Sequence, residues 1–171
     1  MSLSVTNTSD GNYIRTISGF RQFVNKTGPF KPAKGRYHLY ISLACPWANR
    51  CFALLKLKGL EDIIGVSIVH PTWQKTKSNE EHFGWKFFDY KNNTNNEKIV
   101  SHLGHGDFTK AVEQCTIDPL NDANYVRDLY ELANDTTGKY SVPILWDIET
   151  KTIVNNESSE IIRMLNEEFN D

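Results

Sequence analysis

The first half of the chain alternates between apolar runs and polar segments in a pattern typical of mixed α/β proteins. Residues 37–42 form an apolar run that predicts a buried strand, and residues 46–58 have helical spacing. Gly59 follows directly, in the position that ends many helices. Residues 63–69 are rich in β-branched side chains and predict a second strand. A strand, a helix and a strand in such close succession predict a βαβ unit with parallel strands and a right-handed crossover.

The second half predicts one helix, a hairpin and a final helix. Residues 121–134 read as a helix whose apolar face holds Tyr125, Leu129 and Leu132. Residues 141–147 predict a strand that opens at Pro143, and Ile153 and Val154 predict its hairpin partner. The last helix is expected to begin with Ser158 as its N-cap residue and to bury Ile161, Ile162 and Leu165. The resulting order, βαβ–α–ββα, is that of an α/β, thioredoxin-like fold.

Two polar segments flank or interrupt these elements. Residues 1–34 read as an N-terminal arm, in which Ile14, Ile17, Phe20 and Phe23 recur at three-residue steps and predict a short extended or helical packing segment. The domain itself spans residues 35–171 and contains an inserted loop at about residues 70–120. His102 and His105 lie in this loop, but no further ligands accompany them, so no metal site is expected.

Composition excludes several classes of function. The chain of 171 residues has a net charge of −2, so no basic surface for nucleic acid is expected. No apolar run approaches the roughly 20 residues of a membrane-spanning helix, and residues 1–12 lack the pattern of a signal peptide. The three cysteines are an odd number, which favours a reducing compartment and predicts a cytoplasmic protein.

The candidate chemistry lies at the start of the first helix, where Cys45 is followed by Pro46. Backbone N–H groups and the positive end of the helix dipole converge there, and both favour a thiolate, the nucleophilic form of cysteine. Position 48 is Ala, so Cys45 lacks the partner of a Cys-x-x-Cys redox pair and must be resolved by an external thiol. The alternative is that Cys45 is a buried small apolar residue, as we expect for Cys51 and Cys115.

Five segments in the same order resemble one family. They are Lys-Pro-Ala-Lys-Gly-Arg-Tyr at 31–37, Ser-Leu-Ala-Cys-Pro-Trp-Ala-Asn-Arg at 42–50, Gly-Trp-Lys-Phe at 84–87, Ser-Val-Pro-Ile-Leu-Trp-Asp at 141–147 and Thr-Ile-Val-Asn-Asn-Glu-Ser-Ser-Glu-Ile-Ile-Arg-Met-Leu-Asn at 152–166. Together they resemble the Xi-class glutathione transferases, the glutathionyl-hydroquinone reductases, which are related to the omega class. The resemblance covers about residues 29–169 and implies a glutathione-binding domain of thioredoxin-like fold.

The resemblance implies a role for each matching residue. Cys45 would attack the sulfur of a glutathionylated aromatic substrate and form a mixed disulfide with glutathione, which a second glutathione resolves. Trp85 would pack on bound glutathione, and the backbone of Ser141 and Val142 would pair with its cysteinyl part. Lys139 stands where the family often has arginine. The implied glutathione-binding residues are Trp85, Lys139, Tyr140, Ser141, Val142, Pro143, Glu157 and Ser158, of which the last two would hold the γ-glutamyl end.

The sequence also departs from the family pattern. Members carry a second, all-helical domain with tyrosine proton donors, and these 171 residues contain no counterpart of it. We therefore expect glutathione binding and thiol exchange with weakened hydroquinone reduction, and a homodimer is possible. Asn49 replaces the more usual histidine. Two other functions stay open: monothiol, glutaredoxin-like deglutathionylation of proteins, and a non-catalytic binding module of thioredoxin fold.

Overall fold

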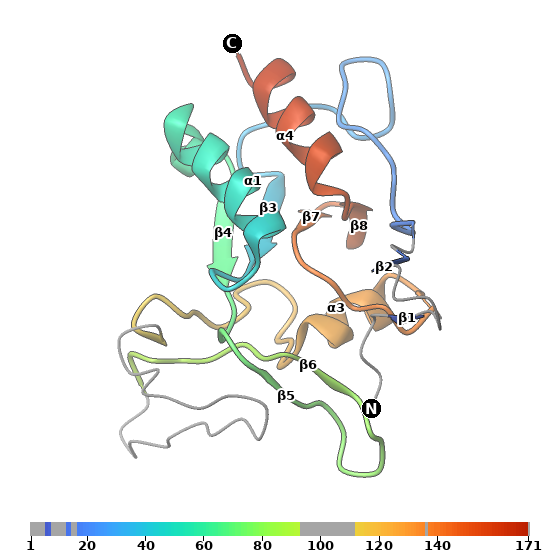
Figure 1. Cartoon of the computed structure of the whole chain (residues 1–171). Helices are drawn as coiled ribbons and strands as arrows, with labels where there is room; N and C mark the ends of the chain where they lie inside the picture. The colour runs from blue at the N-terminus through green and yellow to red at the C-terminus, as the bar shows by residue number, and fades with distance from the viewer. Residues whose placement is uncertain (1–5, 8–12, 15–16, 93–111, 136, 171) are drawn as a thin grey trace.

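The sheet at the centre of the molecule has the strand order β4-β3-β7-β8 (Figure 1). The structure is a computed structural model that describes residues 6–7, 13–14, 17–92, 112–135 and 137–170. Strand β3 (Tyr37–Ile41) pairs in parallel with β4 (Gly65–Ile68) and antiparallel with β7 (Ile144–Asp147). Strand β8 (Thr152–Asn155) completes an antiparallel hairpin with β7. The predicted βαβ unit, the hairpin and the thioredoxin-like order are confirmed.

Helices α1 (Pro46–Leu57) and α4 (Ser158–Glu167) lie side by side across one face of this sheet (Figure 1). The predicted end of α1 is correct, since Gly59 follows its C-cap residue and has a φ of 64°. A short 3₁₀ helix, η1 (Leu60–Asp62), then precedes β4, which begins at Gly65, two residues later than the strand predicted over residues 63–69. Helix α4 buries Ile161, Met164 and Leu165, whereas the predicted Ile162 is only half-buried.

Helix α3 (Val126–Leu132) is shorter than the predicted helix over residues 121–134. The carboxylate of Asp118 accepts the backbone N–H groups of Leu120, Asn121 and Ala123, and these bonds hold the chain before α3 in a loop. The predicted apolar face is therefore wrong in part. Leu129 is buried as expected, but Leu132 is 52% exposed and Tyr130 is buried instead.

The inserted region covers the other face of the sheet and contributes a small hairpin, β5 (Trp73–Lys75) with β6 (Phe83–Trp85). The hydroxyl of Tyr40 on β3 donates to Asp118 across 2.7 Å, and the Tyr40 ring packs edge-on against Phe87. The backbone N–H of Thr116 donates to Ile68 at the edge strand β4. The predicted His102 and His105 lie outside the described residues.

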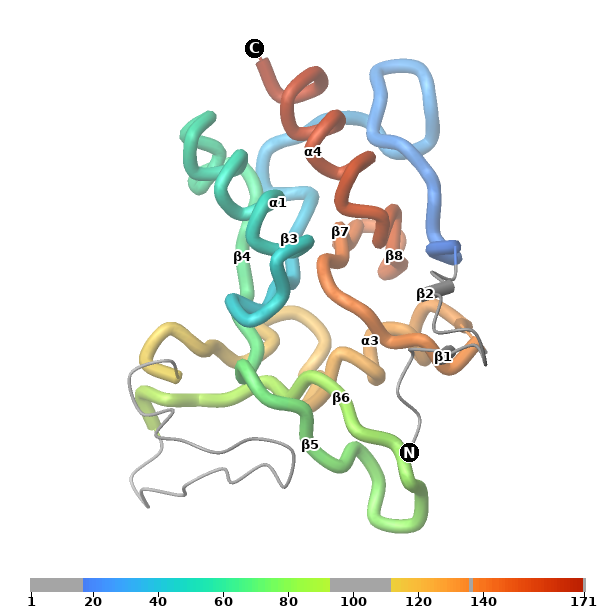
Figure 2. The backbone as a smooth tube through the Cα atoms, viewed as in Figure 1, coloured from blue at the N-terminus to red at the C-terminus, as the bar shows by residue number. Residues whose placement is uncertain are grey.

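The N-terminal arm runs along the opposite edge of the sheet. After the two-residue strands β1 (Thr6–Asn7) and β2 (Tyr13–Ile14), residues 17–24 pass beside β8 toward α4 (Figure 2). The N–H of Gln22 donates to the Val154 carbonyl, and the Asn156 N–H donates to the Phe20 carbonyl. The arm is extended here, and Phe20 packs against the core while Ile17 is 80% exposed. The prediction of a packing role for Ile17 is therefore wrong.

Candidate functional site

Cys45 is the N-cap residue of α1 and lies against the loop that precedes β7. Its backbone is extended, with φ −100° and ψ 112°, and its carbonyl accepts the N–H of Asn49 at 3.0 Å. Pro46 occupies the start of the helix, as the sequence predicted. The Cys45 sulfur lies 3.5 Å from the carbonyl oxygen of Val142, 97 residues further along the chain, and Cys45 is 8% exposed. The thiol therefore sits at a helix start, next to a second candidate segment.

Three hydrogen bonds hold the turn that carries Cys45, the longest of them from the N–H of Ala44 to the Ser42 hydroxyl at 3.3 Å. The N–H of Cys45 donates to the Ser42 carbonyl at 3.0 Å. The side-chain amide of Asn49 donates to the Leu43 carbonyl at 2.7 Å. Asn49, which has no interpretation in the sequence, thus ties the first turn of α1 back to the preceding turn.

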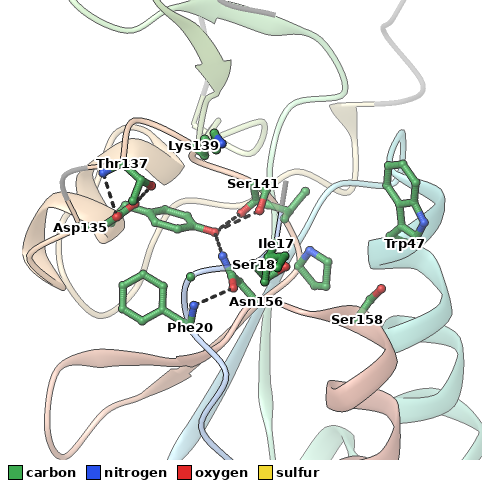
Figure 3. Close-up of a pocket in the computed structure, with 14 residues that line it drawn as sticks. Ile17, Ser18, Phe20, Trp47, Asp135, Thr137, Lys139, Ser141, Asn156 and Ser158 are labelled. Carbon is green, nitrogen blue, oxygen red and sulfur yellow. Dashed lines mark hydrogen bonds between the residues drawn. The ribbon is translucent and has the colours of Figure 1, made fainter. Parts of the chain in front are cut away.

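A cavity of about 210 Å³ adjoins Val142, the residue that the Cys45 sulfur contacts (Figure 3). Cys45 itself is not part of its lining. The cavity walls come from the arm, from the start of α1, from α3 and the loop after it, from the segment before β7 and from the start of α4. Five of the predicted glutathione-binding residues line it: Lys139, Ser141, Val142, Pro143 and Ser158. The peptide bond between Val142 and Pro143 is cis. The other lining residues are Ile17, Ser18, Gly19, Phe20, Trp47, Tyr130, Asp135, Thr137 and Asn156.

The predicted pair Glu157 and Ser158 stands at the start of α4, with roles that differ from the prediction. Glu157, not Ser158, is the N-cap residue, because its carboxylate accepts the backbone N–H of Ser159 at 3.3 Å. The hydroxyl of Ser158 instead accepts a 3.0 Å hydrogen bond from Nε of Arg50, on α1. The Arg50 guanidinium also lies 3.8 Å from the Glu157 carboxylate.

The arm covers Glu157. The hydroxyl of Ser18 donates to the second carboxylate oxygen of Glu157 at 3.1 Å, and Glu157 is 6% exposed. Glu157 consequently stands behind the cavity wall, whereas its neighbours Ser158 and Asn156 line the cavity. Sequence reasoning did not identify Ser18 as part of this site.

The structure does not bring Trp85 and Tyr140 into the cavity lining. Trp85, on β6, packs edge-on against Trp73 with ring centroids 5.6 Å apart. The Tyr140 ring contacts His82 at 5.1 Å and lies 5.4 Å from the guanidinium carbon of Arg127. Both side chains contact the inserted hairpin or its neighbours, although the residues that follow Tyr140 line the cavity.

Cys51 and Cys115 are buried, and neither lines the cavity. Burial raises the pKa of Cys51 to about 12 and that of Cys115 to about 11. Their sulfurs lie 3.6 Å from the backbone carbonyls of Ser158 and Val69 respectively. Both residues are therefore thiols at neutral pH.

Sequence reasoning also missed Tyr130, Asn156 and Arg50. Asp128 is the sequence feature that could have indicated an inward position for Tyr130. An acidic residue three positions after the N-cap often accepts backbone N–H groups and so marks where a helix starts. Asp128 accepts the backbone N–H of Tyr125 at 2.9 Å, which fixes the register of α3 and turns Tyr130 inward. Arg50 and Asn156 have no comparable local signal, because their partners lie on other elements.

The part of the chain that the structure describes contains neither a cluster of metal ligands nor a membrane-spanning helix. Within residues 17–92, 112–135 and 137–170, no group of three or more His, Cys, Asp and Glu side chains is placed to hold a metal ion. The helices described there are all too short or too polar to cross a membrane.

Known proteins resemble this chain in sequence and in structure. The family model described as glutathione S-transferase, N-terminal domain, matches residues 44–168. The structure of the Xi glutathione transferase of Phanerochaete chrysosporium is 45% identical, with a TM-score of 0.69, over 92% of this chain and 44% of that one. The Xi glutathione transferase ECM4 of Saccharomyces cerevisiae, solved in complex with glutathione, is 38% identical, with a TM-score of 0.69, over 88% of this chain and 44% of that one.

A curated relative also matches nearly all of this chain and less than half of its own length. The glutathionyl-hydroquinone reductase YqjG of Escherichia coli (strain K12) is 36% identical over 173 residues, which are 96% of this chain and 44% of the relative. The chain spans less than half the length of the curated relatives it matches.

Proposed function

Because the chain belongs to the Xi-class, omega-like glutathione transferases, the family of the glutathionyl-hydroquinone reductases, we propose that it binds glutathione beside Cys45 and reduces S-glutathionyl-hydroquinones. One observation carries this proposal. The Cys45 sulfur lies 3.5 Å from the carbonyl oxygen of Val142, and Val142 lines a cavity together with Lys139, Ser141 and Ser158. A nucleophilic thiol close to a cavity of mixed polar and apolar lining suits a ligand that carries its own sulfur.

Each end of glutathione has a proposed partner. The backbone of Ser141 and Val142 pairs with the cysteinyl part, as an added strand would. The γ-glutamyl end lies at the start of α4, where Ser158 offers a hydroxyl for its carboxylate. The Glu157 carboxylate stands behind the cavity wall and binds the ammonium group by exchanging its hydrogen bond from Ser18 for one from the ligand. Lys139 attracts the glycine carboxylate as a point charge, without the two-pronged geometry of arginine. Trp85 and Tyr140 lie outside the lining of this cavity, and their contacts with glutathione stay predictions from the family resemblance.

The proposed reaction has two displacements at sulfur. The Cys45 thiolate attacks the sulfur of the substrate thioether, which forms a sulfur–sulfur bond and breaks the bond from sulfur to the aromatic carbon. The electron pair of the broken bond stays on that carbon, which takes a proton, and the hydroquinone leaves. A second glutathione thiolate then attacks the mixed disulfide, releases the Cys45 thiolate and leaves as oxidised glutathione.

The proton for the leaving carbon sets a limit on this chain. The family resemblance assigns that proton to tyrosines of a second domain, which has no counterpart in these 171 residues. Exchange with a disulfide needs no such proton, since the leaving group is a thiolate. We therefore expect the 171-residue chain to react faster with oxidised glutathione than with aromatic thioethers.

The test is to incubate the protein with oxidised glutathione and to measure its intact mass. We expect one glutathione adduct on the wild-type chain and on Cys51→Ser, the matched control. Cys45→Ser should form none, and added glutathione should remove the adduct from the other two. Absence of an adduct on the wild type, or its persistence in Cys45→Ser, would overturn the proposal.

Substrate choice is tested in the same assay. Cys45 adducts are measured after exposure to S-glutathionyl-hydroquinone and to a glutathionylated peptide at equal concentration. Adduct and free hydroquinone from the first substrate support the proposed activity. A reaction with the peptide that is faster than the reaction with oxidised glutathione, without release of hydroquinone from the first substrate, identifies a glutaredoxin-like deglutathionylase instead.

A further inference from the structure

The hydroxyl of Tyr130 joins two segments of the cavity wall, one at Ser141 and one at Asn156. It lies 2.9 Å from the carbonyl oxygen of Ser141 and 3.2 Å from the Ser141 hydroxyl. It also accepts a 2.8 Å hydrogen bond from the side-chain amide of Asn156. Ser141 opens the segment proposed for the cysteinyl part, and Asn156 directly precedes the pair proposed for the γ-glutamyl end.

The bonds from Tyr130 to the Ser141 carbonyl and from Asn156 to Tyr130 have a defined direction. Burial raises the pKa of Tyr130 to about 12, although the hydrogen bonds to Ser141 and Asn156 act in the opposite direction. Tyr130 therefore keeps its proton at physiological pH and donates it toward Ser141. The amide nitrogen of Asn156 must then donate to the phenol oxygen, which leaves the amide oxygen as an acceptor.

The arm holds Asn156 in this orientation. The backbone N–H of Phe20 donates to the Asn156 amide oxygen at 3.2 Å, and the Asn156 N–H donates to the Phe20 carbonyl at 3.1 Å. The Phe20 ring also packs edge-on against the Tyr130 ring, with centroids 5.9 Å apart. Both ends of the Asn156 amide are thereby bonded, so the bridge has little freedom to rotate.

We propose that Tyr130 is a positioning residue that sets the spacing between the cysteinyl and γ-glutamyl parts of the glutathione site. The inference rests on the proposed function, since it assigns a role in that same site. Tyr130 acts through Ser141 and Asn156. A ligand that spans both segments requires their spacing to be correct, whereas a small ligand that reaches only Cys45 does not.

The matched control is Tyr37, a second buried tyrosine whose hydroxyl has only a structural role. Tyr37 is fully buried like Tyr130, and its hydroxyl donates to the Lys31 carbonyl at 2.7 Å. Neither residue of this second pair lines the cavity. Tyr37→Phe therefore removes a comparable hydrogen bond at a distance from the proposed site.

The experiment measures how fast Cys45 forms an adduct with two disulfides, in the wild type, Tyr130→Phe and Tyr37→Phe. Oxidised glutathione spans the proposed site, and bis(2-hydroxyethyl) disulfide reaches only the thiol. Tyr130→Phe removes the bonds to Ser141 and Asn156. It should slow the reaction with oxidised glutathione by at least about fivefold, the effect of one net hydrogen bond, and change the rate with the small disulfide by less than about twofold. Tyr37→Phe should leave both rates within about twofold of the wild type.

Each other outcome contradicts a defined part of the argument. Equal slowing with both disulfides would mean that Tyr130 only stabilises the fold, and would overturn the inference. An unchanged rate in Tyr130→Phe, with a wild type that prefers oxidised glutathione, would overturn the inference and leave the proposed function in place. A wild type without that preference would overturn both.

Discussion

The side-chain amide of Asn49 donates to the carbonyl of Leu43 across 2.7 Å, and this bond closes the turn that carries Cys45. The backbone N–H of Asn49 also donates to the Cys45 carbonyl at 3.0 Å. One residue therefore holds the cysteine from both sides of the helix start. The position of the thiol against Val142 thus depends on Asn49 together with Ser42, which accepts the Cys45 N–H.

Asn49→Ala should loosen the turn around Cys45. We expect the free energy of unfolding to fall by about 1 kcal/mol, because a partly buried carbonyl loses its donor. The reaction of Cys45 with oxidised glutathione should slow as well. Urea unfolding and the rate of adduct formation measure the two effects. Asn49→His keeps an N–H donor and should recover most of the rate; equal rates in the wild type and Asn49→Ala would contradict this role.

Native-state alkylation should distinguish the three cysteines. Near neutral pH, iodoacetamide should modify Cys45 and spare Cys51 and Cys115, because burial raises the pKa of those two thiols to about 12 and about 11. Peptide mapping by mass spectrometry locates the label. All three cysteines should react in denaturant, which serves as the control, and native labelling at Cys51 would show that α1 and α4 separate readily.

His38 should make the fold sensitive to mild acid. Burial lowers the pKa of His38 to about 4 from its ordinary 6.5, although Asp118 raises it slightly. The unfolded chain therefore binds more protons than the folded chain between these two values. Stability should fall as the pH decreases through this window, by on the order of 3 kcal/mol from this residue, and should not depend on it above the unfolded pKa.

Urea unfolding of the wild type and His38→Gln at several pH values tests this. Burial also lowers the pKa values of His70 and His82, so the wild-type slope includes their contributions. The difference between the two proteins isolates His38. Parallel curves for the two proteins would show that His38 does not carry the effect.

Gly65→Ala should destabilise the contact between β3 and β4. A Cβ at position 65 would lie 2.4 Å from the Nδ1 atom of His38, whose Nε2 is bonded to Ser67 at 2.8 Å. The ring cannot withdraw without losing that bond, so we expect a cost of about 1–3 kcal/mol. A double-mutant cycle with His38→Ala checks the cause, since the cost of Gly65→Ala should largely disappear there. Additive costs would refute the clash.

Asp147→Asn should be among the most damaging single changes. Asp147 is fully buried, and its two oxygens accept 2.7 and 3.1 Å hydrogen bonds from the Arg36 guanidinium. The substitution leaves Arg36 without its buried partner and should cost about 3–5 kcal/mol in urea unfolding. Glu149→Gln is the control, because Glu149 also contacts Arg36 but is 61% exposed, so it should change stability by less than about 1 kcal/mol.

The ion pair between Arg36 and Asp147 also predicts that the folded state loses stability at low pH. Burial raises the pKa of Asp147, but the hydrogen bonds from Arg36 and Thr150 outweigh it and lower the pKa below the ordinary 3.8. The stabilisation is therefore present above that value and is lost as the pH falls through the lowered pKa. The acid unfolding midpoint should rise in Asp147→Asn and stay unchanged in Glu149→Gln.

The sequence predicted the features that depend on neighbours in the chain. The strands, the βαβ order and the end of α1 at Gly59 follow from local periodicity and from the φ that glycine accepts. The predicted helix over residues 121–134 is longer than α3, because the carboxylate of Asp118 accepts the backbone N–H groups that precede the helix. Propensity predicts Ser158 as the N-cap residue of the last helix, but Glu157 is the N-cap of α4. Glu157 has partners on distant elements, Ser18 and Arg50, which local propensity does not include.

The walls of the candidate site were predicted only in part, for a related reason. Ser141, Val142 and Ser158 belong to segments with recognisable sequence patterns. Tyr130 and Asn156 acquire their roles from each other, 26 residues apart, and Phe20 from a residue 136 positions away. No periodicity or motif encodes such a pairing, so it became visible only in the folded chain.

The pairing of the arm with β8 also bears on how the protein is made. A ribosome synthesises Phe20 and Gln22 long before Val154 and Asn156, the residues that provide their backbone partners. Contacts between such distant positions raise the contact order of the domain, which slows folding. During translation the arm therefore has to stay unpaired until nearly the whole domain has emerged. The edge of the sheet at β8 and the wall of the cavity at Phe20 are completed together, late in synthesis.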